Sequence, residues 1–106
     1  MDARVQVPKQ ARRGEVIDVR IAIKHPMETG FRYDVMGKPI PKNVINSLLV
    51  TYNGAEIFRA ELGSGIAANP YLQFSTVAEA SGELRFEWVD DNGTRGEERA
   101  RITVTG

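Results

Sequence analysis

The sequence predicts an all-β fold of the immunoglobulin-like sandwich class. Apolar residues alternate with polar residues along most of the chain, turn signals separate these stretches at short intervals, and no stretch has the spacing of an amphipathic helix. About seven short strands in a chain of 106 residues are typical of a sandwich of antiparallel strands. We therefore expect a single domain over residues 1–106, with an extra hairpin-like insertion.

The clearest strands carry β-branched or aromatic residues at every second position. In the stretch 15–24, the alternate apolar residues are all isoleucine or valine, which favours a strand over a helix. In the stretch 83–89, Leu84, Phe86 and Trp88 alternate with charged residues, so these three side chains are predicted to lie in the core. The predicted strands are residues 3–7, 15–24, 44–52, 55–62, 71–78, 83–89 and 97–105.

Turn residues lie between these strands. Asn53-Gly54 is a strong signal for a two-residue hairpin turn, because both residues tolerate positive φ. Residues 90–93 (Asp-Asp-Asn-Gly) predict a C-terminal hairpin, and Ser81-Gly82 predicts a turn before it. Pro8 is expected to end the first strand.

The segment of residues 25–42 is longer than most connections in compact domains. Within it Phe31, Tyr33 and Val35 alternate with polar residues, so it is predicted to fold as a small hairpin that turns near Gly37-Lys38.

The predicted strand 44–52 is apolar on both faces. We expect Ile45 and Leu49 on the outer face, and the core face to carry Val44, Leu48, Val50 and Tyr52. A strand that is apolar on both faces must be covered on both. The outer face is therefore predicted to lie under the long segment or under another protein.

Composition argues against several classes of protein. The 14 basic and 14 acidic residues cancel, whereas nucleic-acid binding favours a basic excess. No apolar run approaches the roughly 20 residues that span a bilayer, and the N-terminus lacks the hydrophobic core of an export signal. The chain has no cysteine, hence no disulfide, thiolate ligand or cysteine nucleophile.

No catalytic constellation is recognisable, and we expect no enzyme activity and no cofactor. There is one histidine, and the adjacent carboxylates Asp90-Asp91 and Glu97-Glu98 suit a turn and a solvated strand end. Residues 63–65 (Gly-Ser-Gly) lack the lysine and helix of a phosphate-binding loop.

One set of residues has the chemistry of a copper site. Imidazole and thioether groups suit copper, so His25, Met27 and Met36 could together hold Cu(I). The alternative is that the two methionines are adaptable apolar contacts at a binding surface, which we prefer because their spacing matches no metal-site template. The small, glycine-rich loop of residues 62–69 is either a plain crossover or a place where another backbone approaches closely.

Several ordered motifs resemble the Z subunit of the bacterial sulfur-oxidation (Sox) carrier complex. They are residues 25–30 (His-Pro-Met-Glu-Thr-Gly), Asp34, Gly37-Lys38, Ile40-Pro41, Ile45, residues 68–74 (Ala-Asn-Pro-Tyr-Leu-Gln-Phe) and residues 86–93 (Phe-Glu-Trp-Val-Asp-Asp-Asn-Gly). The resemblance extends over nearly the whole chain, including residues 9–15.

This resemblance implies a non-catalytic, immunoglobulin-like subunit of a carrier complex. It would pair with a SoxY-type subunit, whose flexible C-terminal tail bears a cysteine that carries sulfur intermediates during thiosulfate oxidation. It implies a periplasmic location reached by export with that partner, and only indirect contact with other Sox enzymes. The alternatives from other classes are a periplasmic copper-binding β-sandwich and a stand-alone adhesion-type domain.

The apolar and aromatic residues of the long segment and its surroundings are the candidate partner contacts. The predicted partner-binding residues are Met27, Phe31, Tyr33, Met36, Ile45, Leu49, Asn69 and Tyr71. Without its partner, the chain is expected to form a two-fold dimer through this patch or through an uncovered strand edge.

Overall fold

The computed structural model describes residues 2–63 and 65–106, and the described residues form eight strands and no helix. The strands are β1 (Ala3–Gln6), β2 (Gln10–Arg12), β3 (Val16–Ile23), β4 (Ile45–Tyr52), β5 (Ala55–Glu61), β6 (Tyr71–Val77), β7 (Gly82–Asp90) and β8 (Arg95–Thr105). Each of the seven predicted strands is present, with bounds that differ by one or two residues from the prediction. The all-β class is thereby confirmed.

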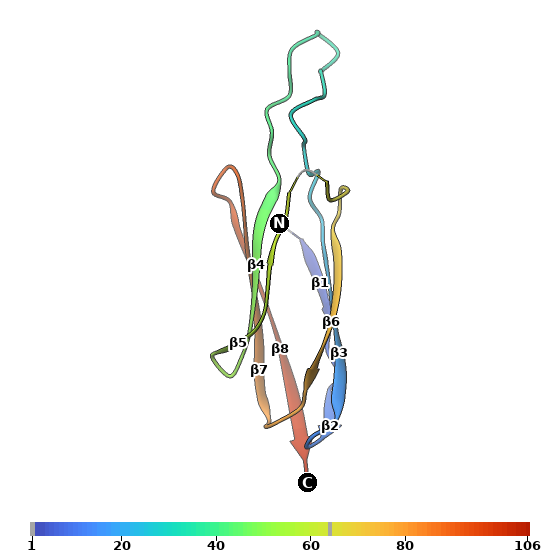
Figure 1. Cartoon of the computed structure of the whole chain (residues 1–106), viewed down its shortest axis with the longest axis vertical. Helices are drawn as coiled ribbons and strands as arrows, with labels where there is room; N and C mark the ends of the chain where they lie inside the picture. The colour runs from blue at the N-terminus through green and yellow to red at the C-terminus, as the bar shows by residue number, and fades with distance from the viewer. Residues whose placement is uncertain (1, 64) are drawn as a thin grey trace.

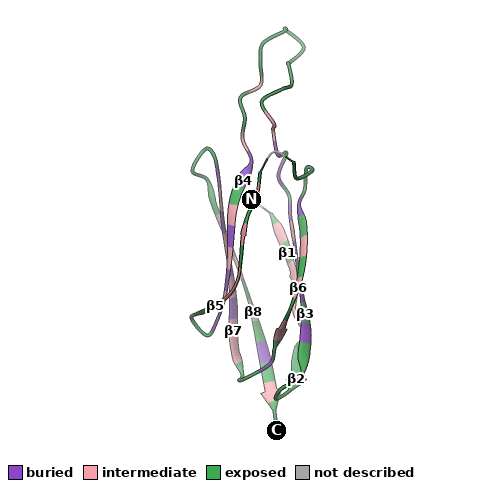
Figure 2. Cartoon of the chain, in the orientation of Figure 1, coloured by how far each residue is buried: buried purple, intermediate pink, exposed green. Residues whose placement is uncertain are grey.

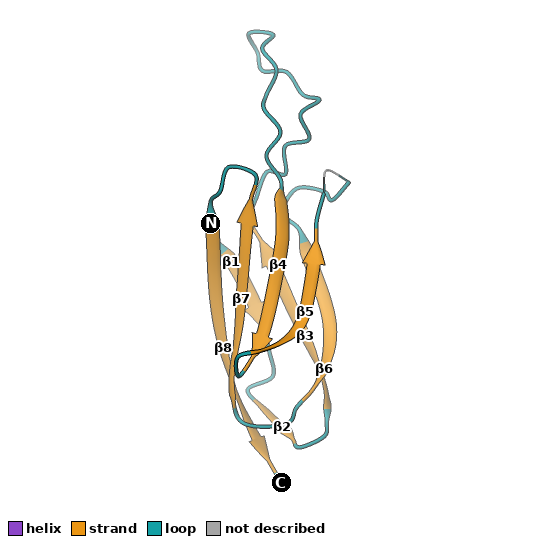
Figure 3. Ribbon diagram, turned by 60° about the vertical axis from the view of Figure 1, so that its left-hand side comes forward, coloured by secondary structure: helices purple, strands orange, loops and turns teal. Residues whose placement is uncertain are grey.

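The strands form a sandwich of two sheets (Figures 1 and 3). One sheet has three strands in the order β1-β3-β6, and the other has five in the order β2-β8-β7-β4-β5. All pairings are antiparallel except that of β2 with β8, which is parallel. The core lies between the sheets, and the purple stretches of Figure 2 mark the buried residues that β3, β4, β7 and β8 contribute.

The alternating residues predicted to point inward do so. Ile17, Val19, Ile21 and Ile23 of β3 are buried. So are Leu84, Phe86 and Trp88 of β7, as predicted, and they belong to the same apolar cluster. Inward-facing side chains from both sheets therefore fill the space between the two sheets, as in other sandwiches.

The strand β2 was not predicted. Its three residues contain one buried side chain, Ala11, and three residues are too few for a visible alternation. The chain leaves the three-stranded sheet after β1, passes Pro8 and joins the edge of the other sheet beside Thr103–Thr105 of β8. The proline lacks an N–H to donate, which suits a break between two sheets.

The turn at Asn53-Gly54 has the predicted form. Both residues have positive φ, 48° and 85°, and the turn joins β4 to β5 as a hairpin. The side chain of Asn53 also reaches the start of β7, where its Oδ1 accepts a hydrogen bond from Glu83 N–H at 3.0 Å.

The long segment projects from one end of the sandwich as two arms, drawn in teal to green in Figure 1. We call residues 26–43 the extension. Its arms are joined by bridges between Glu28 and Asn43 and between Tyr33 and Pro39. The hairpin prediction is confirmed, but the turn is formed by residues 34–37, slightly earlier than predicted. The extension adds to the length of the molecule, which measures 61 × 19 × 19 Å.

The prediction that β4 is apolar on both faces was wrong. A bulge between Ile45 and Ser47, in the pairing of β4 with β7, turns Ile45 into the core and leaves Asn46 outside. Only Leu49 remains on the outer face, half-buried between Arg59 of β5 and Glu87 of β7. The extension does not cover this face, because it points away from the sheet (Figure 3).

Candidate partner-binding site

The base of the extension is anchored by a buried histidine. His25 Nδ1 accepts a hydrogen bond from Met27 N–H at 2.9 Å, so the proton of a neutral ring lies on Nε2. Nε2 then donates to Asp90 Oδ2 at 3.2 Å. Both side chains are buried, and they join the start of the extension to the end of β7.

Asp90 is held by the turn that follows it as well. Its Oδ1 accepts hydrogen bonds from the N–H groups of Asn92 and Thr94, at 3.0 and 2.9 Å. Burial raises the pKa of this carboxyl, but the hydrogen bonds from His25 and these two N–H groups, together with the side chain of Asn43, outweigh it, so the pKa lies below its usual value. Asp90 is therefore a structural carboxylate, ionised at neutral pH.

The second arm of the extension is anchored by Asp91. Its Oδ2 accepts a hydrogen bond from Val44 N–H at 3.2 Å, and its own N–H donates to the carbonyl of Val44. Hydrogen bonds from Asn46 and Val44 lower the pKa of this exposed carboxyl, and the charge of Lys42 contributes further. The adjacent carboxylates Asp90 and Asp91 thus hold one arm each. The two residues were predicted as turn residues, and their role as anchors was not predicted, since their partners His25 and Val44 lie far away along the chain.

The tip of the extension, which carries Phe31, Tyr33, Val35 and Met36, is the most exposed apolar part of the described structure. Phe31 is 84 % exposed, Val35 102 % and Met36 80 %, and Tyr33 is 68 % exposed beside them. The turn itself is fixed by Asp34, whose Oδ1 accepts hydrogen bonds from the N–H groups of Met36 and Lys38. The tip therefore presents apolar side chains on an ordered turn. Figure 2 shows this part of the chain in the green of exposed residues, at a distance from the sandwich.

Two of the predicted partner-binding residues are buried. Met27 is in the core, where its sulfur accepts a hydrogen bond from Ile45 N–H at 3.3 Å, and Ile45 itself is fully buried. The prediction that these two side chains form part of an accessible surface was wrong. Met27 has a positive φ of 49°, which the hydrogen bond from its N–H to His25 helps to maintain.

The other predicted residues are accessible but fall into separate places. Phe31, Tyr33 and Met36 share the tip, whereas Leu49 lies on the outer face of the five-stranded sheet. Asn69 and Tyr71 lie at the end of the sandwich from which the extension projects, at the start of β6 in the three-stranded sheet. Asn69 Oδ1 accepts a hydrogen bond from His25 N–H, and Asn69 N–H donates one to the carbonyl of His25. Tyr71 is 56 % exposed at the start of β6. The structure thus brings Asn69 and Tyr71 near the base of the extension.

The three possible copper ligands do not come together. Both ring nitrogens of His25 are used by Met27 N–H and Asp90, and Met27 is buried at the base while Met36 is exposed at the tip. Within residues 2–63 and 65–106, no group of three or more His, Cys, Asp or Glu side chains is placed to hold a metal ion. In the same residues, no helix could span a membrane.

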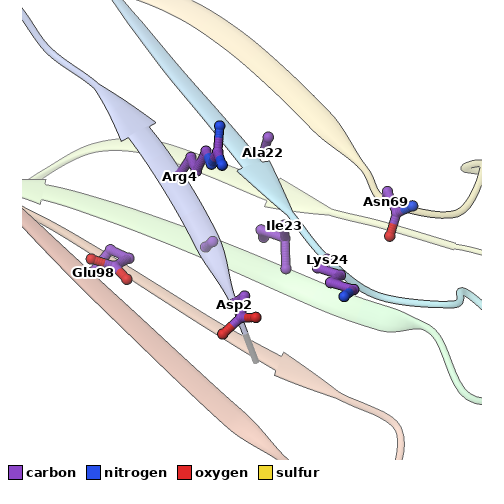
Figure 4. A pocket seen from close by; sticks show the side chains of 8 residues that line it. Asp2, Arg4, Ala22, Ile23, Lys24, Asn69 and Glu98 are labelled. Carbon is purple, nitrogen blue, oxygen red and sulfur yellow. The ribbon is translucent and has the colours of Figure 1, made fainter.

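An open cleft lies beside the base of the extension (Figure 4). It is bounded by the ends of β1 and β3 on one side and by Glu98 of β8 on the other, with Asn69 at its margin. Arg4 and Lys24 contribute positive charge, and Asp2 and Glu98 contribute negative charge. This mixture does not favour one class of charged ligand.

Comparison with known proteins decides the family. Residues 5–101 match the family model described as "Sulphur oxidation protein SoxZ". The chain belongs to the SoxZ family. This confirms the resemblance to the Z subunit, and it makes the chain a component of sulfur oxidation. No curated protein sequence matches the chain.

Solved structures with the same fold include proteins of different activities. A superoxide reductase (neelaredoxin) from Ignicoccus hospitalis is 18 % identical with a TM-score of 0.77, and the match covers 99 % of this chain and 81 % of that one. The sulfur carrier protein SoxY from Chlorobium limicola is 10 % identical with a TM-score of 0.67, covering 98 % of this chain and 79 % of that one. At these identities the likeness shows the fold alone.

Proposed function

We propose that this SoxZ chain is the non-catalytic subunit of a sulfur carrier complex. In this role it scaffolds a SoxY-type subunit, whose C-terminal-tail cysteine carries sulfur intermediates during thiosulfate oxidation. Family membership supports the pathway. The sequence contains no cysteine, which fits a division of labour in which the partner carries the sulfur.

The observation that carries the proposal is the exposed apolar tip on an anchored base. Aromatic and methionine side chains are enriched in the cores of protein interfaces, and few residues usually provide most of the binding energy. Phe31, Tyr33 and Met36 are of these types and are largely exposed in the isolated chain. The base residues hold the arms in place before binding, which reduces the entropy lost when the partner is captured.

The proposal includes the setting in which the subunit acts. The SoxY-type partner would form a heterodimer with it, and other Sox enzymes would reach the sulfur through that partner. The complex would act in the periplasm, after export of both chains together. Fractionation of cells with and without the SoxY-type gene tests this, because the chain should then be found in the periplasm only when the partner is made.

Titration calorimetry with a SoxY-type subunit tests the binding surface. Replacing Tyr33 or Met36 by Asp should weaken binding by about 2 kcal/mol or more, roughly 30-fold, because the change places a charge in an apolar interface. The control is Gln10→Asp, which adds the same charge at an exposed position of β2. Circular dichroism should be unchanged in all three variants, since each position is exposed.

If the Tyr33→Asp and Met36→Asp variants bind as tightly as the wild type, the extension is not the interface. Binding would then be sought around residues 62–71, where Asn69 and Tyr71 lie. A thiosulfate-consuming activity of the isolated chain would contradict the non-catalytic role.

A further inference from the structure

The strand β6 is an edge strand without the usual protection. Among the described strands it pairs only with β3, so one side of its backbone has no neighbouring strand within residues 2–63 and 65–106. Its seven residues (Tyr-Leu-Gln-Phe-Ser-Thr-Val) include no charged residue, no proline and no glycine. Edge strands of natural proteins are usually protected by lysine or other charges, by proline, by bulges or by a covering loop.

An edge strand of the five-stranded sheet provides the contrast. The strand β5 borders the other sheet on the same side of the sandwich, and it carries Glu56, Arg59 and Glu61 among its seven residues. Phe58 of β5 and Phe74 of β6 stack with ring centroids 4.3 Å apart, which closes the core between the two sheets at this side. The apolar interior therefore needs no further cover here, and what β6 leaves open is its backbone.

We propose that the β6 edge is a self-association surface, on which a second copy of this chain adds its own β6. The two strands would run antiparallel about a two-fold axis, joining two three-stranded sheets into one continuous sheet. When Phe74 lies opposite Phe74 of the second copy, Gln73 lies opposite Ser75 of that copy, and Tyr71 lies opposite its Val77. A strand with no charge places no like charges opposite each other, so it is complementary to itself.

A two-fold pairing of this kind is closed, because each chain uses its one free β6 edge for the other. It leaves the extension tip accessible, since the tip lies beyond the end of the sandwich (Figure 3). Tyr71, however, belongs both to β6 and to the predicted partner-binding residues. A SoxY-type partner that covers Tyr71 would therefore compete with the second copy. This competition rests on the proposed function, whereas the self-association does not.

Sedimentation equilibrium of the full chain over a range of concentrations tests the pairing. The wild type should change from monomer to dimer, and Ser75→Lys should weaken the dimer about fivefold or more, because the two lysines lie diagonally across the new strand pair. Within its own sheet Ser75 lies opposite Asp18 and donates a hydrogen bond to it at 3.1 Å, so a lysine there has a partner and the fold is kept. Gln10→Lys, at an exposed position of β2, is the control and should dimerise like the wild type.

Hydrogen exchange of the wild type gives a second, variant-free readout. Amides of β6 should exchange more slowly as the concentration rises, while those of β5 should not change. A chain that stays monomeric at all concentrations overturns the proposal. So does a dimer with unchanged β6 exchange, or one that Tyr33→Asp abolishes and Ser75→Lys does not. If a SoxY-type subunit binds the dimer without dissociating it, the proposed competition is wrong, while the β6 pairing stands.

Discussion

His25 and Asp90 illustrate what a single buried polar pair does in this molecule. They lie 65 residues apart in the sequence, and their side chains join where the extension leaves the sandwich. A buried carboxylate is stable only when its oxygen atoms are hydrogen-bonded, and those of Asp90 accept from His25, Asn92 and Thr94. The pair is thus an anchor for the extension rather than a reactive site.

Asp90 makes the stability of the fold depend on pH. Its pKa is lowered in the folded state, so its contribution is complete above its unfolded pKa of about 4 and is lost as pH falls through the folded value. We expect Asp90→Asn to destabilise the protein at pH 7, and the difference from the wild type to shrink below pH 4. Urea unfolding at both pH values measures this, with exposed Asp18→Asn as the control. A difference that stays constant with pH would contradict the assignment.

Trp88 is the largest side chain of the core and is 2 % exposed. It packs over Gly96, the residue opposite it on β8, where a Cβ atom would collide with the indole ring. Trp88→Ala should cost about 3–5 kcal/mol, through lost burial and the cavity left behind. Urea unfolding of the variant and of Glu87→Ala, its outward-facing neighbour, provides the comparison. A loss below about 1 kcal/mol would be typical of a surface position and would place Trp88 outside the core.

At the scale of elements, the turn between β4 and β5 is connected to the start of β7. Asn53 donates a hydrogen bond to the carbonyl of Ser81 and accepts one from Glu83 N–H. A Cβ atom on Gly82 would collide with the Asn53 amide, so glycine is required while that side chain is in place. The hairpin and the sheet are thus fixed together by one side chain.

This arrangement predicts a strong coupling between the two positions. Gly82→Ala should destabilise the fold by about 1–3 kcal/mol, because the Asn53 side chain must move and lose its hydrogen bonds. In the background of Asn53→Gly, the same change should cost much less, since the colliding group is gone and glycine keeps the positive φ. A double-mutant cycle measured by urea unfolding gives the coupling. Additive effects would show that the contact is unimportant.

Local patterns explain which elements could be predicted from the sequence. The alternation over 15–24 and the Asn53-Gly54 turn depend on neighbouring residues only, and both were correct. The bulge that turns Ile45 inward depends on how β4 pairs with β7, which no local pattern reveals. The exposure of Tyr33 and Met36 could be anticipated from their segment, but the anchoring of that segment by Asp90 could not.

At the scale of the whole molecule, the extension lengthens a sandwich that is otherwise compact. The molecule is 61 Å long and 19 Å wide, and the extension projects from the end at which β6 begins (Figure 1). Tyr71 is the first residue of β6, and Asn69 is hydrogen-bonded to His25 there. One end of the molecule therefore concentrates the accessible partner-binding candidates, apart from Leu49. The outer face around Leu49 is occupied by ion pairs such as Arg85 with Glu87, at 2.8 Å.

The few hydrogen bonds between the arms of the extension have a consequence for the lifetime of the unpaired subunit. Between the anchored base and the turn, one backbone hydrogen bond, from Ile40 N–H to the carbonyl of Arg32, joins the described arms. This middle part can open locally while the base and the sandwich stay folded, and an opened segment is cut by proteases. Trypsin should therefore cleave first after Arg32, which is exposed in the first arm, and a bound SoxY-type subunit should slow this cleavage. Mass spectrometry of a timed digest checks this, and first cleavage after Arg101 in β8 would contradict it. In a cell, turnover through this site would match the amount of the subunit to the supply of its partner.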